Sequence, residues 1–205
     1  MACHRNGRAG GRCAGRLRAR RPAHRLCARR PDRAVTHRVF GVTGWKNAGK
    51  TTLVERLTAE FVRRGWRIAT VKHAHHAVDI DQPGTDSFRH RAAGATEVAL
   101  VGGQRYAIMR EVVEPPLSEV LARLSPCDLV LIEGYKREPH PKIEVRADHS
   151  RPMAASDSNI VAIAADAAPV DESLPWFARD DVMAMAKFIA DFVSDQQAPH
   201  DQKPR

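Results

Sequence analysis

Residues 44–52 read Gly-Trp-Lys-Asn-Ala-Gly-Lys-Thr-Thr, and this stretch decides the fold. It matches the pattern G-x-x-x-x-G-K-[ST], in which two glycines let backbone N–H groups turn toward a phosphate. An apolar run, 39–42, precedes it, and a helical pattern follows from Leu53. Lys50 is expected to reach the β- and γ-phosphates, and Thr51 to offer its hydroxyl to Mg²⁺. The sequence therefore predicts a P-loop that binds a nucleoside triphosphate; a plain Gly-rich turn is the alternative. The expected nucleotide contacts are Gly44, Trp45, Lys46, Asn47, Ala48, Gly49, Lys50, Thr51 and Thr52.

Apolar runs alternate with amphipathic stretches along the rest of the chain, the order expected when strands cross over through helices into a mostly parallel sheet. The expected strands cover about 38–43, 67–72, 128–132 and 160–164. The first expected helix covers about 50–64, with Val62 on its apolar stripe. A short helix capped by Asp86 or Ser87 is expected to end at Gly94. Two further helices are expected, one through Leu117 and Leu124 and one at about 180–193. Segments 98–101 and 106–112 flank two glycines and predict a hairpin. We predict an α/β, three-layer P-loop NTPase fold with a mostly parallel sheet and an inserted β-hairpin.

Positive charge is concentrated at the N-terminus. Residues 1–37 hold eleven Arg and one acid, so the remainder of a chain with net charge +9 is nearly neutral. The basic pI therefore describes an arm, and we expect no nucleic-acid binding by the folded domain. The lack of Ser and of any long apolar stretch argues against a targeting peptide. The arm is therefore interpreted as a disordered basic segment or a wrongly assigned start. The predicted domains are this arm, a nucleotide-binding domain at 38–193 and a disordered tail at 194–205.

Cysteine usage predicts a reducing, cytoplasmic location. Cys3, Cys13 and Cys27 lie in the arm at spacings that fit neither a zinc site nor a secreted disulfide framework. Cys127 stands alone before an apolar strand, where a small buried thiol is expected. No apolar stretch is long enough to predict a membrane span.

A second acid is expected near the phosphates, because a bound Mg²⁺ needs a carboxylate to hold it or its water shell. Residues 129–134 read Leu-Val-Leu-Ile-Glu-Gly, which places Glu133 at the end of a buried strand. A carboxylate after four apolar residues is costly to bury without a cation or hydrogen-bond donors. Glu133 is therefore predicted to hold magnesium or its water; a strand-end carboxylate with only local hydrogen bonds is the alternative.

The loop after the second strand holds the other dense polar cluster. It lies on the rim where open parallel sheets bind ligands, and its polar residues include Lys72, His73, His75, His76, Asp79, Asp81, Asp86 and Ser87. It could ligate a transition metal, contact an anionic substrate, respond to nucleotide or be an ordinary solvated loop. Adjacent His75 and His76 would diverge, so no tetrahedral zinc site is expected from this loop alone. We favour anion and magnesium contacts, with Asp81 or Asp79 holding Mg²⁺ through water.

Several stretches together resemble the molybdopterin-guanine dinucleotide biosynthesis adapter protein (MobB) family of P-loop proteins. These are the cradle, 71–87 with its K-H-x-H-H-x-x-D-x-D-x-P-G-x-D-S pattern, Ala93-Gly94-Ala95 and Ile132-Glu133-Gly134-Tyr135-Lys136. The resemblance covers about 38–193 and implies a GTP-binding homodimer that uses Mg²⁺. Such a protein assists the guanylyltransferase that joins GMP to molybdopterin and at most hydrolyses GTP slowly. Molybdopterin itself and molybdoenzyme maturation factors are further candidate partners. The residues expected to meet substrate or partner are Lys72, His73, His75, His76, Asp86, Ser87 and Lys136.

Guanine recognition needs its own explanation, because the chain contains no N-K-x-D box. Asp166 follows the strand at 160–164, where a carboxylate could accept hydrogen bonds from guanine N1 and N2. A loop-capping Asp is the alternative.

An adapter is expected rather than a fast enzyme. Phosphoryl transfer needs a water-orienting residue and an added cation at the γ-phosphate, and the sequence identifies neither. Basic rim residues, including Lys136 and Arg137, could receive a pterin phosphate or a partner's acids, or be solvated charge. Three other functions stay open: a metallochaperone GTPase using His73, His75 and His76, a small-molecule kinase, and RNA binding by the arm.

Overall fold

The computed structural model describes residues 37–74, 80–147, 150–169 and 173–196. The described residues all belong to one compact unit within Ala34–Arg205. The predicted arm lies outside the described residues apart from His37. The arm and the disordered tail therefore stay predictions. No helix within the described ranges is long and apolar enough to cross a membrane.

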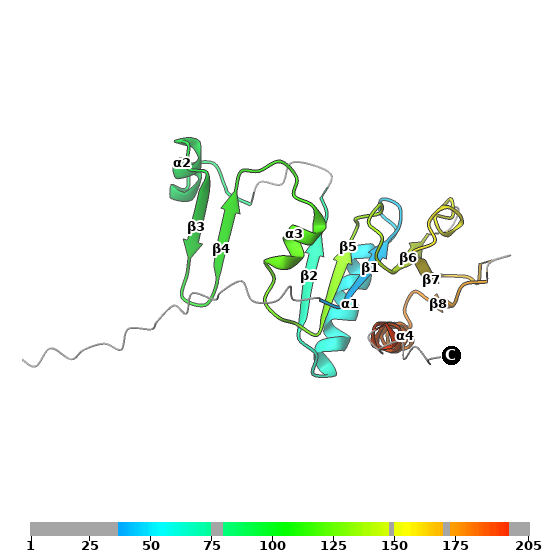
Figure 1. The fold of residues 1–205 in the computed structure, drawn as a ribbon. Helices are drawn as coiled ribbons and strands as arrows, with labels where there is room; N and C mark the ends of the chain where they lie inside the picture. The colour runs from blue at the N-terminus through cyan, green and yellow to red at the C-terminus, as the bar shows by residue number, and fades with distance from the viewer. Residues whose placement is uncertain (1–36, 75–79, 148–149, 170–172, 197–205) are drawn as a thin grey trace, which may run out of the picture. The chain divides into compact units, whose positions relative to one another are not determined.

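Six parallel strands form the main sheet (Figure 1). Their spatial order is β2 (Ile68–Lys72), β5 (Leu129–Glu133), β1 (Val39–Thr43), β6 (Lys142–Arg146), β7 (Ile160–Ala165) and β8 (Trp176–Ala178). Val42 on β1 pairs with Glu133 on β5, and Lys72 on β2 pairs with the same residue from the other side. Parallel pairing brings the carboxyl ends of these strands to one edge, where ligands bind in such sheets. The predicted α/β fold with a mostly parallel sheet is confirmed.

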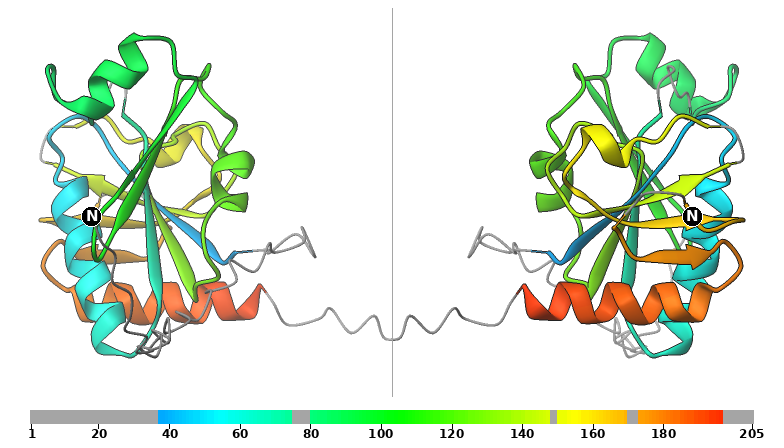
Figure 2. Two further views of the ribbon diagram at one scale, coloured as in Figure 1. Left: turned by 90° about the vertical axis from the view of Figure 1, so that its left-hand side faces the viewer. Right: turned by 90° about the vertical axis from the view of Figure 1, so that its right-hand side faces the viewer.

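Helices cover both faces of this sheet and give three layers. Helices α1 (Lys50–Arg63) and α4 (Val182–Asp195) pack against each other on one face, as Figure 2 shows in cyan and orange to red. The short α3 (Leu117–Ala122) covers the other face near β2 and β5. Strand β5 is buried on both sides: Leu129 and Leu131 face α1 and α4, while Val130 and Ile132 face α3. This double burial explains its continuous apolar sequence.

The predicted hairpin is confirmed as a separate two-stranded antiparallel sheet of β3 (Glu97–Val101) and β4 (Tyr106–Arg110). The seven-residue helix α2 (Asp86–Ala92) packs on β3, and Val98 is buried. The opposite face, which we call the apolar hairpin face, presents Val101, Tyr106 and Ile108 with 76%, 72% and 57% exposure. These residues share a face because β-strand side chains alternate.

Strands β6 and β8 were not predicted. Lys142 and Glu144 give β6 a charged, alternating sequence, yet both are buried, at 1% and 0% exposure. Lys142 pairs with Asp157 at 2.8 Å, and Arg146 pairs with Glu144 at 2.7 Å. Buried charges with partners of this kind cannot be told from solvated ones by sequence pattern.

Two finer expectations were wrong. Val62 is 57% exposed, because α1 turns that position away from the sheet. Helix α2 is capped by Thr85, whose hydroxyl accepts a hydrogen bond from the Phe88 N–H, and not by Asp86 or Ser87. The helix begins one residue earlier than the expected caps allow, and Thr is a favoured N-cap residue.

Candidate functional site

The turn between β1 and α1 has the backbone shape that the P-loop pattern predicts. Gly44 and Gly49 have φ values of 150° and 95°, and Asn47 is left-handed at 62°. A Cβ on Gly44 would lie 2.4 Å from the backbone oxygen of Val145 on β6, so only glycine fits there. Helix α1 starts directly after this turn, and its free N–H groups and dipole favour an anion. The cradle is therefore built by β1, β6 and α1 together.

Lys50 and its neighbours make the cradle strongly basic. Lys50 Nζ donates a 2.6 Å hydrogen bond to the carbonyl oxygen of Trp45, across the loop. Burial lowers the pKa of Lys50, and the nearby ammonium groups of Lys136 and Lys72 lower it further against the opposing effect of Glu133. Three ammonium groups near one carboxylate leave an excess of positive charge, which an anionic ligand would neutralise.

Trp45 is held in a defined position although it is 43% exposed. Its indole Nε1 donates a 2.7 Å hydrogen bond to the carbonyl oxygen of Arg151. Lys136 Nζ lies 4.6 Å from its ring centroid, a cation–π contact. Lys136 therefore joins the segment after β5 to the cradle. Lys46 and Asn47 are exposed, whereas Ala48 is buried beneath the loop.

Glu133 lies beside the first turn of α1, as expected. Its Oε1 accepts a 2.8 Å hydrogen bond from the Thr51 hydroxyl. Lys72 Nζ lies 3.1 Å from the same oxygen and 3.3 Å from Thr51 Oγ1. A hydroxyl, a buried carboxylate and a cation thus already meet at one point.

These residues fit a magnesium ion that is completed by nucleotide phosphates. Mg²⁺ prefers oxygen ligands and is usually held by one or two protein groups plus phosphate and water. Thr51 and Glu133 supply such oxygens. Within the described ranges no group of three or more His, Cys, Asp or Glu could hold a metal by itself. When bound, the ion would neutralise phosphate charge.

A cavity of about 550 Å³ lies beside the cradle, next to α1 and the ends of β7 and β8, and we call it the base-side cavity. Asp166 and Arg179 line it, and Arg179 Nη1 lies 2.9 Å from Asp166 Oδ2. The other guanidinium nitrogen, Nη2, donates to the carbonyl oxygen of Ala48 at 3.1 Å. Arg179 therefore ties Asp166 to the P-loop.

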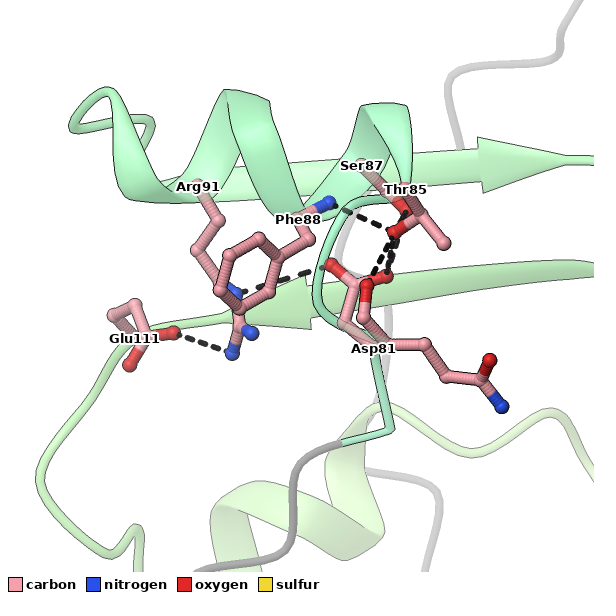
Figure 3. Close-up of polar contacts among 7 residues, drawn as sticks. Asp81, Thr85, Ser87, Phe88, Arg91 and Glu111 are labelled. Atoms are coloured by element: carbon pink, nitrogen blue, oxygen red, sulfur yellow. Dashed lines mark hydrogen bonds and ion pairs between the residues drawn. The ribbon is translucent and has the colours of Figure 1, made fainter.

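The polar loop after β2 is only partly described. His75, His76 and Asp79 lie outside the described residues. Asp81 is buried, and accepts hydrogen bonds from Ser87 at 2.6 Å and Thr85 at 3.3 Å (Figure 3). Arg91 lies 3.9 Å from its second carboxylate oxygen and 3.1 Å from Glu111. These contacts hold Asp81 at the start of α2, and its predicted magnesium role stays a prediction.

The remaining loop residues separate into two groups. His73 Nε2 makes a 2.7 Å hydrogen bond with Glu114, and its ring packs on Tyr135 with centroids 4.5 Å apart. Asp86 is exposed on α2, where its carboxylate lies 3.6 Å from Arg89. His73 and Lys72 thus lie beside the segment that follows β5, whereas Asp86 and Ser87 belong to α2.

Residues 39–166 match the family described as molybdopterin guanine dinucleotide synthesis protein B, MobB. The chain belongs to the MobB family. Among curated relatives, the molybdopterin-guanine dinucleotide biosynthesis adapter protein of Haemophilus influenzae is 39% identical over 130 residues, covering 62% of this chain and 73% of the relative. The adapter protein of Escherichia coli is 34% identical over 166 residues, covering 77% and 94%. The resemblance inferred from the sequence is confirmed, and with it the prediction of an adapter in this biosynthesis.

Solved MobB structures share the fold. A crystal structure of molybdopterin-guanine biosynthesis protein B superposes with a TM-score of 0.62 at 28% identity, covering 76% of this chain and 99% of that one. The MobB homologue from Bacillus stearothermophilus gives 0.58 at 31% identity, covering 77% and 98%. The P-loop fold expected from the cradle is therefore the fold of MobB.

Sequence reasoning missed two contributors to this MobB site. Arg179 follows an unpredicted three-residue strand, and nothing in its local sequence marks it as a contact of the P-loop. Val145 belongs to β6, a strand that was not predicted because its sequence contains several charged residues.

Proposed function

We propose that this chain is a cytoplasmic, Mg²⁺- and GTP-binding adapter that assists the guanylyltransferase attaching GMP to molybdopterin. The single observation that supports it most is the ion pair of Lys72 with Glu133 at 3.1 Å beside the P-loop, where Lys50 and Lys136 add further ammonium groups. A buried carboxylate with a neighbouring hydroxyl suits a magnesium ion, and the surplus ammonium groups suit the phosphates. Among the proteins it resembles, the curated relatives carry the adapter name.

Guanine preference is proposed to rest on Asp166. Its carboxylate lines the base-side cavity, which opens beside Gly49 and Thr52 at the start of α1. A carboxylate accepts hydrogen bonds from the N1 and N2 groups of guanine, whereas adenine offers no such pair of donors. Arg179 holds the carboxylate from the other side at 2.9 Å, which limits its rotation.

Slow hydrolysis is also proposed, and the position of Arg179 supports it. Arg179 is directed toward Ala48 and Asp166 on the base side, so it is not placed as an arginine finger. Fast turnover depends on a cation of that kind at the γ-phosphate. We therefore infer that GTP acts mainly as a bound effector, which orders the 73–87 segment for docking on the transferase.

A homodimer is proposed to form through the apolar hairpin face. A two-stranded sheet is marginally stable by itself, and Val101, Tyr106 and Ile108 leave a contiguous apolar surface on it. Hairpin edges also offer unpaired backbone groups to a second copy. Packing the apolar hairpin face of one copy on that of a second copy would bury both surfaces in one symmetric contact.

The deciding experiment replaces Lys50 with Ala. Isothermal titration calorimetry with GTP and Mg²⁺ should show binding to the wild type and none to Lys50→Ala. Stimulation of a MobB-responsive molybdopterin guanylyltransferase should be lost together with it. Lys187→Ala is the matched control, because Lys187 is an exposed lysine on α4 that pairs with Asp191. Full stimulation by Lys50→Ala would contradict nucleotide-gated docking.

The alternatives gain no support from the site. His73 is already engaged by Glu114 and Tyr135, and no cluster of metal-ligating residues occurs within the described part of the chain. Since His75, His76 and Asp79 lie outside that part, the metallochaperone function is tested by measuring nickel or zinc binding to the wild type. Stoichiometric binding that is lost in a His73, His75, His76 triple Ala variant would favour it. Kinase activity would appear as labelled phosphate on a metabolite.

A further inference from the structure

A second cavity, of about 670 Å³, lies outside the phosphate cradle. Its walls are the segment 135–138 after β5, the segment 114–117 before α3, and His73. Cavities of roughly 300–1,000 Å³ are the usual size for sites that hold small organic ligands. No step of the proposed nucleotide chemistry uses this space.

One wall of the second cavity is aromatic. The rings of Tyr135 and His73 pack with an interplanar angle of 31°, and Glu114 fixes the imidazole through a 2.7 Å hydrogen bond. Tyr135 has φ at 46°, a left-handed conformation that bulky residues rarely adopt and that tends to persist at functional sites. Burial raises the pKa of the Tyr135 hydroxyl, and the carboxylates of Glu114 and Glu138 raise it further. A flat ring can therefore stack in a partly desolvated environment beside two acids.

The other walls indicate which chemical groups a ligand with such a ring must carry. Lys136 and Arg137 supply cations that suit a phosphate, while Glu114 and Glu138 supply acceptors for N–H donors. Pro116 and its neighbours supply an apolar surface. An occupant thus needs a flat ring, a donor edge and an anionic group. A pterin phosphate has all three, because its aminopyrimidinone edge carries N–H donors and its side chain ends in a phosphate.

We propose that the second cavity binds the pterin phosphate end of molybdopterin. The proposal rests on the adapter function proposed above and names a second ligand for it. The donor edge meets Glu114 or Glu138, the ring packs on Tyr135, and the phosphate meets Lys136 and Arg137.

Lys136 makes the two ligand sites neighbours. It lines the second cavity, and its ammonium lies 4.6 Å from the Trp45 ring in the cradle. It also lowers the pKa of Lys50 through charge repulsion. One cation thus faces both anionic ligands, so that GTP and the pterin phosphate occupy adjoining parts of one face.

The test uses 6-hydroxymethylpterin monophosphate as a stable, fluorescent probe for the full-length protein. Its fluorescence is titrated with wild type, Tyr135→Ala, Tyr135→Phe, Arg137→Ala and Arg123→Ala. Arg123→Ala is the matched control for Arg137, because Arg123 is an exposed arginine that forms an ion pair with Glu119 on α3. Unphosphorylated pterin, inorganic phosphate and GMP are the competitors. Thermal unfolding and GTP calorimetry on every variant verify folding and the cradle.

We expect saturable binding to the wild type, weakened about tenfold or more by Tyr135→Ala, which removes the stacking surface, and by Arg137→Ala, which removes a phosphate contact. Tyr135→Phe and Arg123→Ala should bind as the wild type does. Lack of wild-type binding, or unchanged affinity in Tyr135→Ala, would overturn the proposal. Displacement by GMP at equal concentration would show a guanine nucleotide site instead. Lys50→Ala should keep pterin binding while losing GTP, so failure of either site is distinguishable from failure of the other.

Discussion

Lys72 Nζ lies 3.1 Å from Glu133 Oε1, so the last residue of β2 is paired with the last residue of β5. The same oxygen accepts the Thr51 hydroxyl hydrogen bond at the start of α1. Lys72 thereby links the polar loop that follows it to the cradle. A magnesium ion bound by Thr51 and Glu133 would compete with this ammonium for the carboxylate. Such competition would couple nucleotide binding to the position of the loop.

Replacing Glu133 with Gln should remove most of the benefit of magnesium. The affinity for GTP in the presence of Mg²⁺ should fall about tenfold to a hundredfold, as for other losses of a metal-supporting group. Affinity measured in excess EDTA should change little, because the cradle lysines remain. Calorimetry under both conditions gives the comparison, with Glu119→Gln on α3 as the control. Equal losses with and without magnesium would show that Glu133 acts on folding and not on the ion.

Asp166→Asn should change which base is bound. The amide keeps one acceptor and gains donors, so affinity for GTP should fall about tenfold to a hundredfold. Affinity for XTP should rise, because xanthine carries a carbonyl where guanine carries its 2-amino group. Competition against a fluorescent nucleotide measures both ratios. Asp180→Asn, which also lines the base-side cavity, is the control; a specificity change there and none at Asp166 would reassign the base contact.

Ile108→Lys should convert the proposed dimer to a monomer. It places a charge in the apolar hairpin face, and burying an unpaired ammonium in a symmetric contact costs several kcal/mol. Sedimentation velocity at micromolar concentration should then show one species of half the mass. Val62→Lys is the control, because Val62 is an apolar residue of the same 57% exposure on α1. A wild-type monomer would remove the dimer proposal altogether.

Stability should depend on His140 between about pH 6.5 and 4. Burial lowers the pKa of His140 to about 4, with Lys142 adding to the effect and Asp157 opposing it. The unfolded chain binds this proton more readily, so the contribution is complete above pH 6.5 and is lost as the pH falls toward 4. The loss should amount to about 3 kcal/mol at most over that window.

His140→Gln should remove that part of the pH dependence. Urea midpoints measured at pH 7, 6, 5 and 4.5 give the slope, which should become flatter in the variant whatever its absolute stability. His90→Gln, on the exposed side of α2, should keep the wild-type slope. An unchanged slope in His140→Gln would assign the titration to other groups.

Local patterns were enough to find the cradle, because a P-loop is a contiguous turn whose glycines and lysine stand at fixed spacing. They also identified Glu133, since a single acid after four apolar residues is conspicuous. The hairpin and helix α1 followed from turn glycines and from helical spacing. The family resemblance rested on the same short stretches, and so it was visible without the fold.

Tertiary structure alone decided which distant groups meet at the cradle. Strand β6 was not predicted from the sequence, because Lys142 and Glu144 read as solvated charges. They are buried with partners, and only the fold decides which charged side chains meet. The strand nevertheless supplies Val145, which requires glycine at position 44. Arg179 reaches Ala48 from 131 residues away, and Lys136 reaches Trp45 from a different strand end. Sequence determined the chemistry available to this protein, because residue types and local spacing are written in it. The fold determined the two cavities, because parallel pairing brings strand ends far apart in the chain to one edge.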